Sequence, residues 1–151
     1  MLDDLKELYQ EVILDHSKHP RNFGKITPCS HEGHGYNPLC GDTINVYLEL
    51  DEKEHITDIT FDGKGCAIST ASASMMTDVI KGKSVSDANT LFEDFRSLAT
   101  GEHENINAGE DTERLMILAG VKQFPMRVKC ATLPWHAMHT ALLGKTEIST
   151  E

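Results

Sequence analysis

The chain lacks a long apolar run and is poor in basic residues. No stretch approaches the roughly 18 apolar residues that span a bilayer, and the first residues include Asp3, Asp4 and Lys6 where a secretory leader has an apolar core. With 24 acidic residues against 14 basic ones, the net charge of -10 disfavours nucleic-acid phosphates or an anionic membrane as the main partner. We therefore expect a cytoplasmic protein with no nucleic-acid and no membrane partner.

The chain also lacks a Cys-x-x-Cys pair, internal repeats and low-complexity segments. In the reducing cytosol, four cysteines do not predict a disulfide framework, and their spacing matches no zinc-finger pattern. At 151 residues with 39% hydrophobic content, the chain is long enough for one core and too short for two comfortable ones. We expect a single domain over residues 1–151.

Apolar periodicity predicts a mixture of helices and strands. Residues 18–38 hold many proline, glycine and asparagine residues and are predicted to form a long ordered loop with at most one edge strand. Alternating apolar residues predict two strands, over 43–50 and 56–61, that form an antiparallel hairpin. A period of 3.6 predicts helices over 3–16, 71–82, 87–98 and 111–118, and one more after Pro125.

The ends of these helices bear on the chemistry. Ser69 or Thr70 is expected to cap the helix over 71–82, so Cys66 falls just before a helix N-terminus, where peptide dipoles favour a thiolate over a thiol. Ser86 is expected to cap the next helix. Pro134 is expected to kink the last helix or to make it start afresh.

Three of the four cysteines lie in short segments that contain a turn or a helix start. Cys40, Cys66 and Cys130, with Asp42 two residues after the first, could close a tetrahedral zinc site. The alternative is that they are small buried side chains, which is more often the state of a lone cytosolic cysteine. Cys29 has no partner motif, and we interpret it as a buried or incidental surface thiol.

Other candidate ligands have simpler explanations. The histidines are expected to be solvated or core residues, and the methionine pair to belong to the core; these residues are His31, His34, His136, His139, Met75 and Met76. The acidic residues between 87 and 113 are expected to form a solvated face of the middle helices.

The amino-acid sequences of the cysteine-containing segments resemble those of a known family. The segments 37–42 (NPLCGD), 63–69 (GKGCAIS) and 127–133 (RVKCATL), with the opening at 8–9 and 19–22, resemble the NifU/IscU-like family of iron–sulfur cluster biogenesis proteins over nearly the whole chain. Within that family the chain is most similar to the SufU type of Gram-positive bacteria. Lys129 precedes Cys130 where the IscU scaffold carries a histidine ligand, and residues 83–109 resemble the SufU insertion.

The resemblance implies a fold, a metal site and a function. The fold is α+β, a small antiparallel sheet of about three strands with helices on one face, in a SufE/IscU-like architecture. One zinc ion would be bound by Cys40, Asp42, Cys66 and Cys130. Cys40 would accept persulfide sulfur from a PLP-dependent cysteine desulfurase of the SufS type, after a histidine of that enzyme displaces it from zinc, and Arg127 would steady the thiolate or persulfide.

Two other functions stay open. In one, the protein is a scaffold on which a [2Fe–2S] cluster forms and from which it passes to apo-proteins; Lys129 argues against this, because the histidine of that scaffold is absent. In the other, it is a structural zinc protein. By contrast, under the function that the resemblance implies, the protein is a sulfurtransferase-like carrier that passes sulfur to downstream Suf assembly components. Under the scaffold alternative the metal would be iron.

Overall fold

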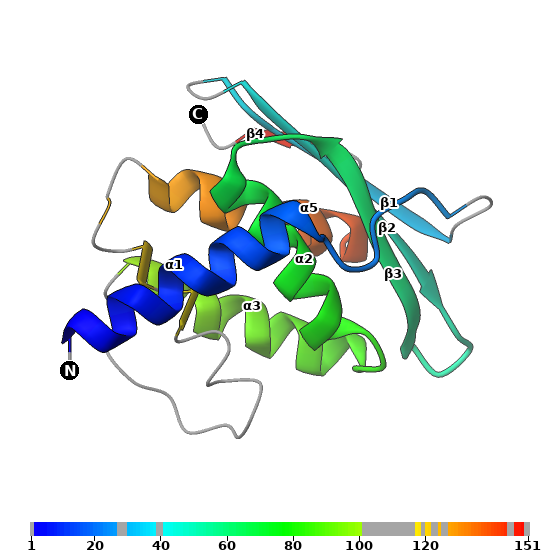
Figure 1. Cartoon of the computed structure of the whole chain (residues 1–151). Helices are drawn as coiled ribbons and strands as arrows, with labels where there is room; N and C mark the ends of the chain where they lie inside the picture. Colours follow the sequence, from blue (N-terminus) through cyan, green and yellow to red (C-terminus); the bar gives the residue numbers. More distant parts are fainter. Residues whose placement is uncertain are drawn as a thin grey trace.

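The structure is a computed structural model that describes residues 2–26, 30–38, 41–100, 117–118, 120–121, 124, 127–144 and 147–149. Among these residues, no helix combines the length and the apolar character that a membrane crossing requires. The elements, labelled as in Figure 1, are α1 (Leu2–Lys18), β1 (His31–Asn37), β2 (Asp42–Leu50), β3 (Ile56–Lys64), α2 (Ala67–Ile80), α3 (Val85–Thr100), α5 (Val128–Leu142) and β4 (Glu147–Ser149).

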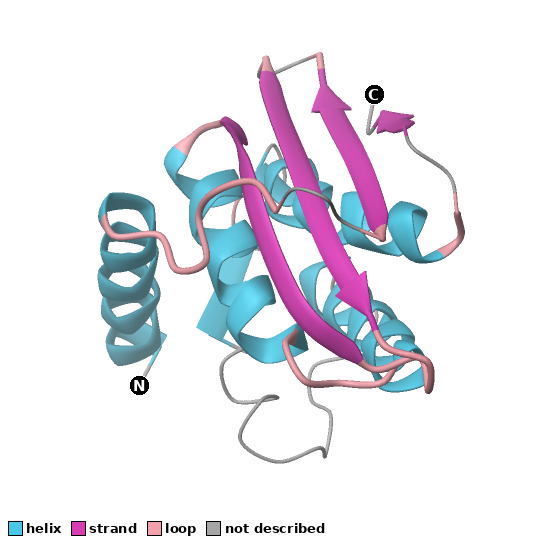
Figure 2. Ribbon diagram, turned by 90° about the vertical axis from the view of Figure 1, so that its right-hand side faces the viewer, coloured by secondary structure: helices cyan, strands magenta, loops and turns pink. Residues whose placement is uncertain are grey.

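The described strands form one sheet in the order β3-β2-β1-β4. β1, β2 and β3 are antiparallel neighbours, so the predicted hairpin is confirmed, and helices cover one side of this sheet (Figure 2). The α+β class and the helix-covered antiparallel sheet of about three strands are therefore confirmed. The short β4, which pairs in parallel with residues 34–36 of β1, was not expected.

β1 is a full strand between β2 and β4, so the expectation of a loop with at most an edge strand is wrong here. The reason lies in two of its glycines. A Cβ at Gly33 would lie 2.2 Å from the carbonyl oxygen of Ala137, and one at Gly35 would lie 2.9 Å from Leu133 Cδ1. These glycines let α5 pack directly on β1, which fixes the position of the helix that carries Cys130.

The core lies between the sheet and the helices. α2 contacts α1, α5 and β3, and it is buried along nearly its whole length. Met75 and Met76 are 3% and 0% exposed, which confirms them as core residues. α5 faces the same core through Leu133 and Ala137. α2 and α5 thus pack against the sheet and against other helices.

α3 begins two residues earlier than expected, at Val85. The Ser84 Oγ accepts a hydrogen bond from the backbone N–H of Asp87 at 3.1 Å, which is the bond of a helix N-cap. The expected cap, Ser86, lies inside the helix. Both serines are good capping residues, but the helix begins directly after Ser84, so Ser84 is the one at the capping position.

α5 runs without interruption through Pro134, so the expected fresh start at this residue is wrong. Proline cannot donate the helical hydrogen bond that the carbonyl of Cys130, four residues earlier, would otherwise receive. Packing of the buried residues around Pro134 outweighs that missing bond. The helix therefore keeps Cys130 in its first turn despite the proline.

Several expectations concern residues outside the described part of the chain. Only residues 117–118 of the predicted helix over 111–118 are described, and they are helical. The polar stretch 101–109, and with it part of the predicted insertion, lies outside the described residues. Cys29 and Cys40 do so as well.

Candidate metal site

Three elements that are distant in the sequence bring metal-ligating side chains together. Asp42 is the first residue of β2, Cys66 immediately precedes α2, and Cys130 lies in the first turn of α5. A carboxylate oxygen of Asp42 and the two sulfur atoms all lie within 4.8 Å of one another. Of the four ligands that the resemblance implies, the structure brings these three together, and it does not describe Cys40.

Asp42 is held in place by the backbone of the segment before α2. Its side chain is buried at 2% exposure, and its Oδ1 accepts a hydrogen bond from the backbone N–H of Cys66 at 2.9 Å. The other oxygen, Oδ2, lies 3.8 Å from Cys66 Sγ. The carboxylate therefore reaches the site already oriented, with one oxygen on the backbone and one beside the thiol.

Two glycines beside these ligands act in different ways. Gly41 has a φ of +72°, a left-handed conformation that glycine adopts without strain. At Gly65, a Cβ would lie 2.2 Å from the Ser69 Oγ and 3.5 Å from Asp42 Oδ1. Gly41 thus serves the turn into β2, whereas Gly65 serves the close approach of the loop to Asp42 and Ser69.

Cys66 is itself the N-cap of α2. Its sulfur accepts from the backbone N–H of Ser69 at 3.5 Å, and the Ser69 Oγ donates to the Cys66 carbonyl at 3.2 Å. The expectation that Ser69 or Thr70 caps this helix is wrong, because the thiol takes the capping place. The half-buried Cys66 sulfur therefore lies at the positive end of the α2 helix dipole.

Cys130 lies deeper, at 0% exposure. The side-chain amide of Asn37 donates towards its sulfur over 3.9 Å. Asn37 is buried at 1% exposure, ends β1 and pairs directly with Asp42 across the sheet. The sequence analysis missed this contact; the signal available was the Asn-Pro turn at the start of the first cysteine segment.

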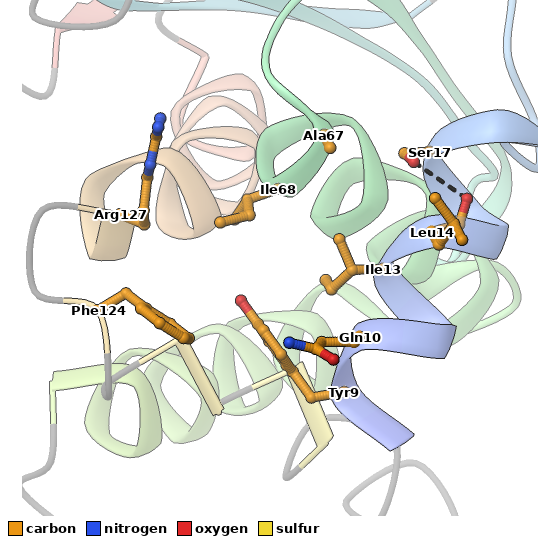
Figure 3. A pocket seen from close by; sticks show the side chains of 9 residues that line it. All are labelled: Tyr9, Gln10, Ile13, Leu14, Ser17, Ala67, Ile68, Phe124 and Arg127. Carbon is orange, nitrogen blue, oxygen red and sulfur yellow. Dashed lines mark hydrogen bonds between the residues drawn. The ribbon is translucent and has the colours of Figure 1, made fainter. Parts of the chain in front are cut away.

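Arg127 immediately precedes α5, three residues before Cys130. Its side chain is exposed and makes no capping hydrogen bond to the helix. Arg127 also lines a pocket that residues of α1 and the start of α2 border (Figure 3). The role of steadying a thiolate or persulfide stays a prediction.

The three donors fit a zinc ion. Thiolates and carboxylates are zinc ligands at about 2.3 Å and 2.0–2.2 Å, so a tetrahedron separates two donors by roughly 3.5–3.8 Å. Donor atoms already within 4.8 Å of one another can reach one ion through small side-chain rotations. A buried carboxylate beside two thiols is also a concentration of negative charge that a cation would offset. Among the described residues, no ion pair involves Asp42.

The histidines that the sequence analysis set aside lie elsewhere. His139 stacks on Phe92 with ring centroids 4.5 Å apart, and His136 meets the same ring edge-on at 5.2 Å. Burial lowers the pKa of His136, and the neighbouring His139 adds to this shift. His34 lies at hydrogen-bond distance from Asn45 on β2. None of these histidines belongs to the group of metal-ligating residues that the structure describes.

Comparison with known proteins gives a consistent result. Residues 8–131 match the family described as the NifU-like N terminal domain. The chain is 41% identical over 141 residues to the iron–sulfur cluster assembly scaffold protein IscU of Streptococcus pyogenes serotype M1, covering 93% of this chain and 86% of that protein. It is 42% identical over 137 residues to the zinc-dependent sulfurtransferase SufU of Bacillus subtilis strain 168, covering 89% of both.

A solved structure agrees with these relatives. A protein of Fervidobacterium islandicum AW-1, proposed to be an iron–sulfur cluster assembly scaffold for the SUF system, superposes with a TM-score of 0.80 at 34% identity, covering 90% of this chain and 97% of that one. The residues matched by the family model include Cys40, Asp42, Cys66 and Cys130, the four candidate ligands. The chain belongs to the NifU-like N-terminal domain family of iron–sulfur cluster assembly proteins, the family of IscU and SufU.

Proposed function

We propose that this protein is a zinc-dependent sulfur acceptor that takes persulfide sulfur from a PLP-dependent cysteine desulfurase of the SufS type and passes it to later assembly components. The observation that carries the proposal is the convergence of Asp42, Cys66 and Cys130 within 4.8 Å. Cys40, two residues before Asp42, would be the fourth ligand and the sulfur acceptor. The similarity to a zinc-dependent sulfurtransferase along most of the chain supports it.

The surroundings of the three described donors suggest different roles. Cys130 is fully buried in α5 and Asp42 is hydrogen-bonded to the backbone, so both are held in place. Cys66 is held by the first turn of α2. Zinc, when bound, would hold the thiols deprotonated near neutral pH. We assign the reacting thiol to Cys40, with Asp42, Cys66 and Cys130 staying on the zinc ion.

The transfer step balances without an added oxidant or reductant. The Cys40 thiolate attacks the terminal sulfur of the cysteine persulfide on the donor enzyme. A new S–S bond forms at Cys40, the S–S bond of the donor breaks, and the donor cysteine leaves as a thiolate. The terminal sulfur keeps its proton, so only the bearer of the persulfide changes.

The test is alanine production by a cysteine desulfurase while this protein is titrated in, with zinc-loaded and metal-free samples compared under a mild reductant. Saturable stimulation that requires zinc is the expected result. Cys40→Ala should abolish it and leave the far-UV circular dichroism unchanged, whereas the matched control Cys29→Ala should behave like the wild type. Persulfide transfer at the wild-type rate in Cys40→Ala would contradict the assignment.

The second candidate is a scaffold on which a [2Fe–2S] cluster is assembled and then transferred to apo-proteins. The observation in its favour is that a relative of equal similarity carries the name of a scaffold. The same titration separates the two functions. Stimulation that is absent with zinc, but is recovered with iron and accompanied by the visible absorption of a cluster, would favour the scaffold.

A further inference from the structure

The sulfur of Cys66 has polar neighbours of three kinds among the described residues, and two of them belong to Ser69. The backbone N–H of Ser69 donates to this sulfur at 3.5 Å, the Ser69 Oγ lies 3.7 Å from it, and the Asp42 Oδ2 lies 3.8 Å from it. The N–H can only donate and an ionised carboxylate can only accept, whereas a hydroxyl can do either. The role of the Ser69 hydroxyl therefore depends on the state of the sulfur.

This hydroxyl has one proton and two acceptors within reach. Its Oγ lies 3.2 Å from the Cys66 carbonyl oxygen, to which it donates, and 3.7 Å from the sulfur of the same residue. Rotation about the Cβ–Oγ bond turns the proton from one acceptor to the other without moving a heavy atom. A thiol has a proton of its own to donate, but a metal-bound thiolate only accepts. A ligating Cys66 thus favours the hydroxyl turning to the sulfur, because a hydrogen bond to a charged acceptor is the stronger one.

The fold keeps the Ser69 hydroxyl beside Cys66. Ser69 is 0% exposed and lies in the first turn of α2. A Cβ at Gly65 would lie 2.2 Å from the Ser69 Oγ, so the loop before Cys66 closes directly over the hydroxyl. A buried hydroxyl that does not share its proton costs free energy. The proton therefore goes to the carbonyl or to the sulfur of Cys66, the acceptors that the described residues offer it.

We propose that Ser69 is a positioning residue for Cys66: when a metal ion is bound, the Ser69 hydroxyl donates to the Cys66 thiolate alongside the Ser69 N–H, and the two bonds keep this sulfur a ligand and not a nucleophile. A thiolate whose charge is stabilised is a weaker nucleophile. The inference rests on the proposed function, because it names a residue that leaves sulfur acceptance to another thiol. The Asn37 amide has a comparable place beside Cys130.

The first test is spectroscopic and needs no sulfur transfer. Cobalt(II) can replace zinc in thiolate sites, and the energy of its sulfur-to-metal charge-transfer absorption reports the electron density on the sulfur. Ser69→Ala removes the hydroxyl but keeps the N–H, so this absorption should move to longer wavelength than in the wild type. Competition with a chelator should show a zinc affinity about tenfold lower. An unchanged absorption in Ser69→Ala would overturn the inference.

Two further variants separate the hydroxyl from the packing around it. Thr70→Ala removes a hydroxyl from the next residue of α2 and should keep the wild-type absorption and zinc affinity. Ser69→Thr keeps the hydroxyl, so it should restore the metal binding that Ser69→Ala weakens. Equal losses of metal binding in Ser69→Ala and Ser69→Thr would overturn the inference, because the hydroxyl would then not be the group that matters.

The second test asks which thiol reacts. Zinc-loaded protein is treated with iodoacetamide, and the alkylated cysteines are followed by mass spectrometry of the digested chain. In Ser69→Ala the rate at Cys66 should rise about threefold or more, while the rate at Cys130 stays at the wild-type value. An equal rise at both cysteines would show a general loosening of the site and would overturn the inference.

The outcomes separate this inference from the proposed function. If the wild type stimulates a cysteine desulfurase but Ser69→Ala has the wild-type absorption and the wild-type alkylation rates, only the role of Ser69 is wrong. If the wild type does not stimulate the desulfurase, while the absorption and the rate at Cys66 change as expected, the proposed function is wrong and the hydrogen bond from Ser69 stands.

Discussion

The first turn of α5 and its middle bury polar groups in different ways. In the middle, the indole N–H of Trp135 donates to the Ser72 hydroxyl at 3.1 Å, and that hydroxyl donates in turn to the carbonyl of Ala131 at 2.5 Å. In the last turn of α5, His139 lies 3.1 Å from the side-chain oxygen of Asn89 on α3. The chain supplies both partners of each of these contacts.

In the first turn, the polar groups that the structure describes are of the kind that bind metal ions. The Cys130 sulfur meets an amide of Asn37 at 3.9 Å, and it shares its surroundings with the carboxylate of Asp42 and the sulfur of Cys66. The carboxylate and the two thiols are metal-ligating groups, so their arrangement suits a cation. We therefore expect mutations in the middle of α5 to lower stability and mutations around its first turn to weaken metal binding.

The largest expected effect is on stability, in the middle of α5. Trp135→Ala should lower the free energy of unfolding by about 3–5 kcal/mol, because it removes the largest fully buried side chain and the partner of Phe95. Urea unfolding of the zinc-loaded protein measures this loss. Trp135→Phe, which keeps an aromatic ring but not the N–H, should lose only about 1–3 kcal/mol. A loss below about 1 kcal/mol in Trp135→Ala would break the comparison.

The next effect concerns the first turn of α5. Asp42→Asn keeps the shape of the side chain but removes its charge, so zinc affinity should fall about 100-fold or more. The stability of the metal-free protein should stay the same or rise, since a buried charge is removed. Competition with a chelator measures the affinity, and urea unfolding without metal measures the stability. Unchanged zinc affinity together with unchanged sulfur transfer would count against Asp42 as a ligand.

A smaller effect is expected behind the ligands. Asn37→Ala removes the donor to Cys130 and should weaken zinc binding about tenfold, in the range seen when a group that orients a ligand is lost. Asn89→Ala, the matched change on α3, should leave zinc affinity unaltered because its partner is His139 near the end of α5. The same chelator competition serves for both variants. Equal affinities in the two would show that Asn37 has no part in the site.

The smallest effect is a pH dependence in the middle of α5. Because burial and the neighbouring charges of His139 and Arg96 lower the pKa of His136 in the folded protein, the unfolded chain binds a proton more readily. The free energy of unfolding should therefore fall as the pH drops below about 6.5, the unfolded value, and level off below the folded pKa. Urea titrations of the metal-free protein at several pH values measure this.

The control for that measurement is a second histidine. His136→Gln should show a shallower decline of stability with falling pH than the wild type, whereas His19→Gln, a change at an exposed position, should keep the wild-type slope. Equal slopes in the wild type and in His136→Gln would show that another group sets the pH dependence.

Much of the fold could be predicted where the signal is local. The alternating apolar residues over 43–50 and 56–61 predicted the hairpin, and the antiparallel pairing of β2 with β3 confirms it. The ligands Asp42, Cys66 and Cys130 were named from their segments, and the structure brings them together. In both cases the prediction depended on residues that are close together in the sequence.

The misses arose where distant packing decides. Gly33 was interpreted as a breaker, yet it is a strand residue whose lack of a side chain admits the backbone of α5. Ser69 is a good capping residue by propensity, but Cys66 takes that place in the fold. Pro134 continues a helix because its surroundings are buried. The sequence places Tyr9 on an amphipathic helix, but it does not show that the Tyr9 hydroxyl has no hydrogen-bond partner among the described residues.

The contact of α5 with β1 also protects the protein from misassembly. If β1 slipped by one residue against β2, side chains that now face away from the helices would turn towards them. His34 or Glu32 would then have to occupy the space that Gly33 leaves beside the Ala137 carbonyl, where even a single Cβ would come within 2.2 Å. A slip of one residue is therefore disfavoured, and the observed alignment sets Asn37 opposite Asp42. The packing of α5 on β1 thus fixes the strand register on which the candidate metal site depends, and it does so without a bound ion.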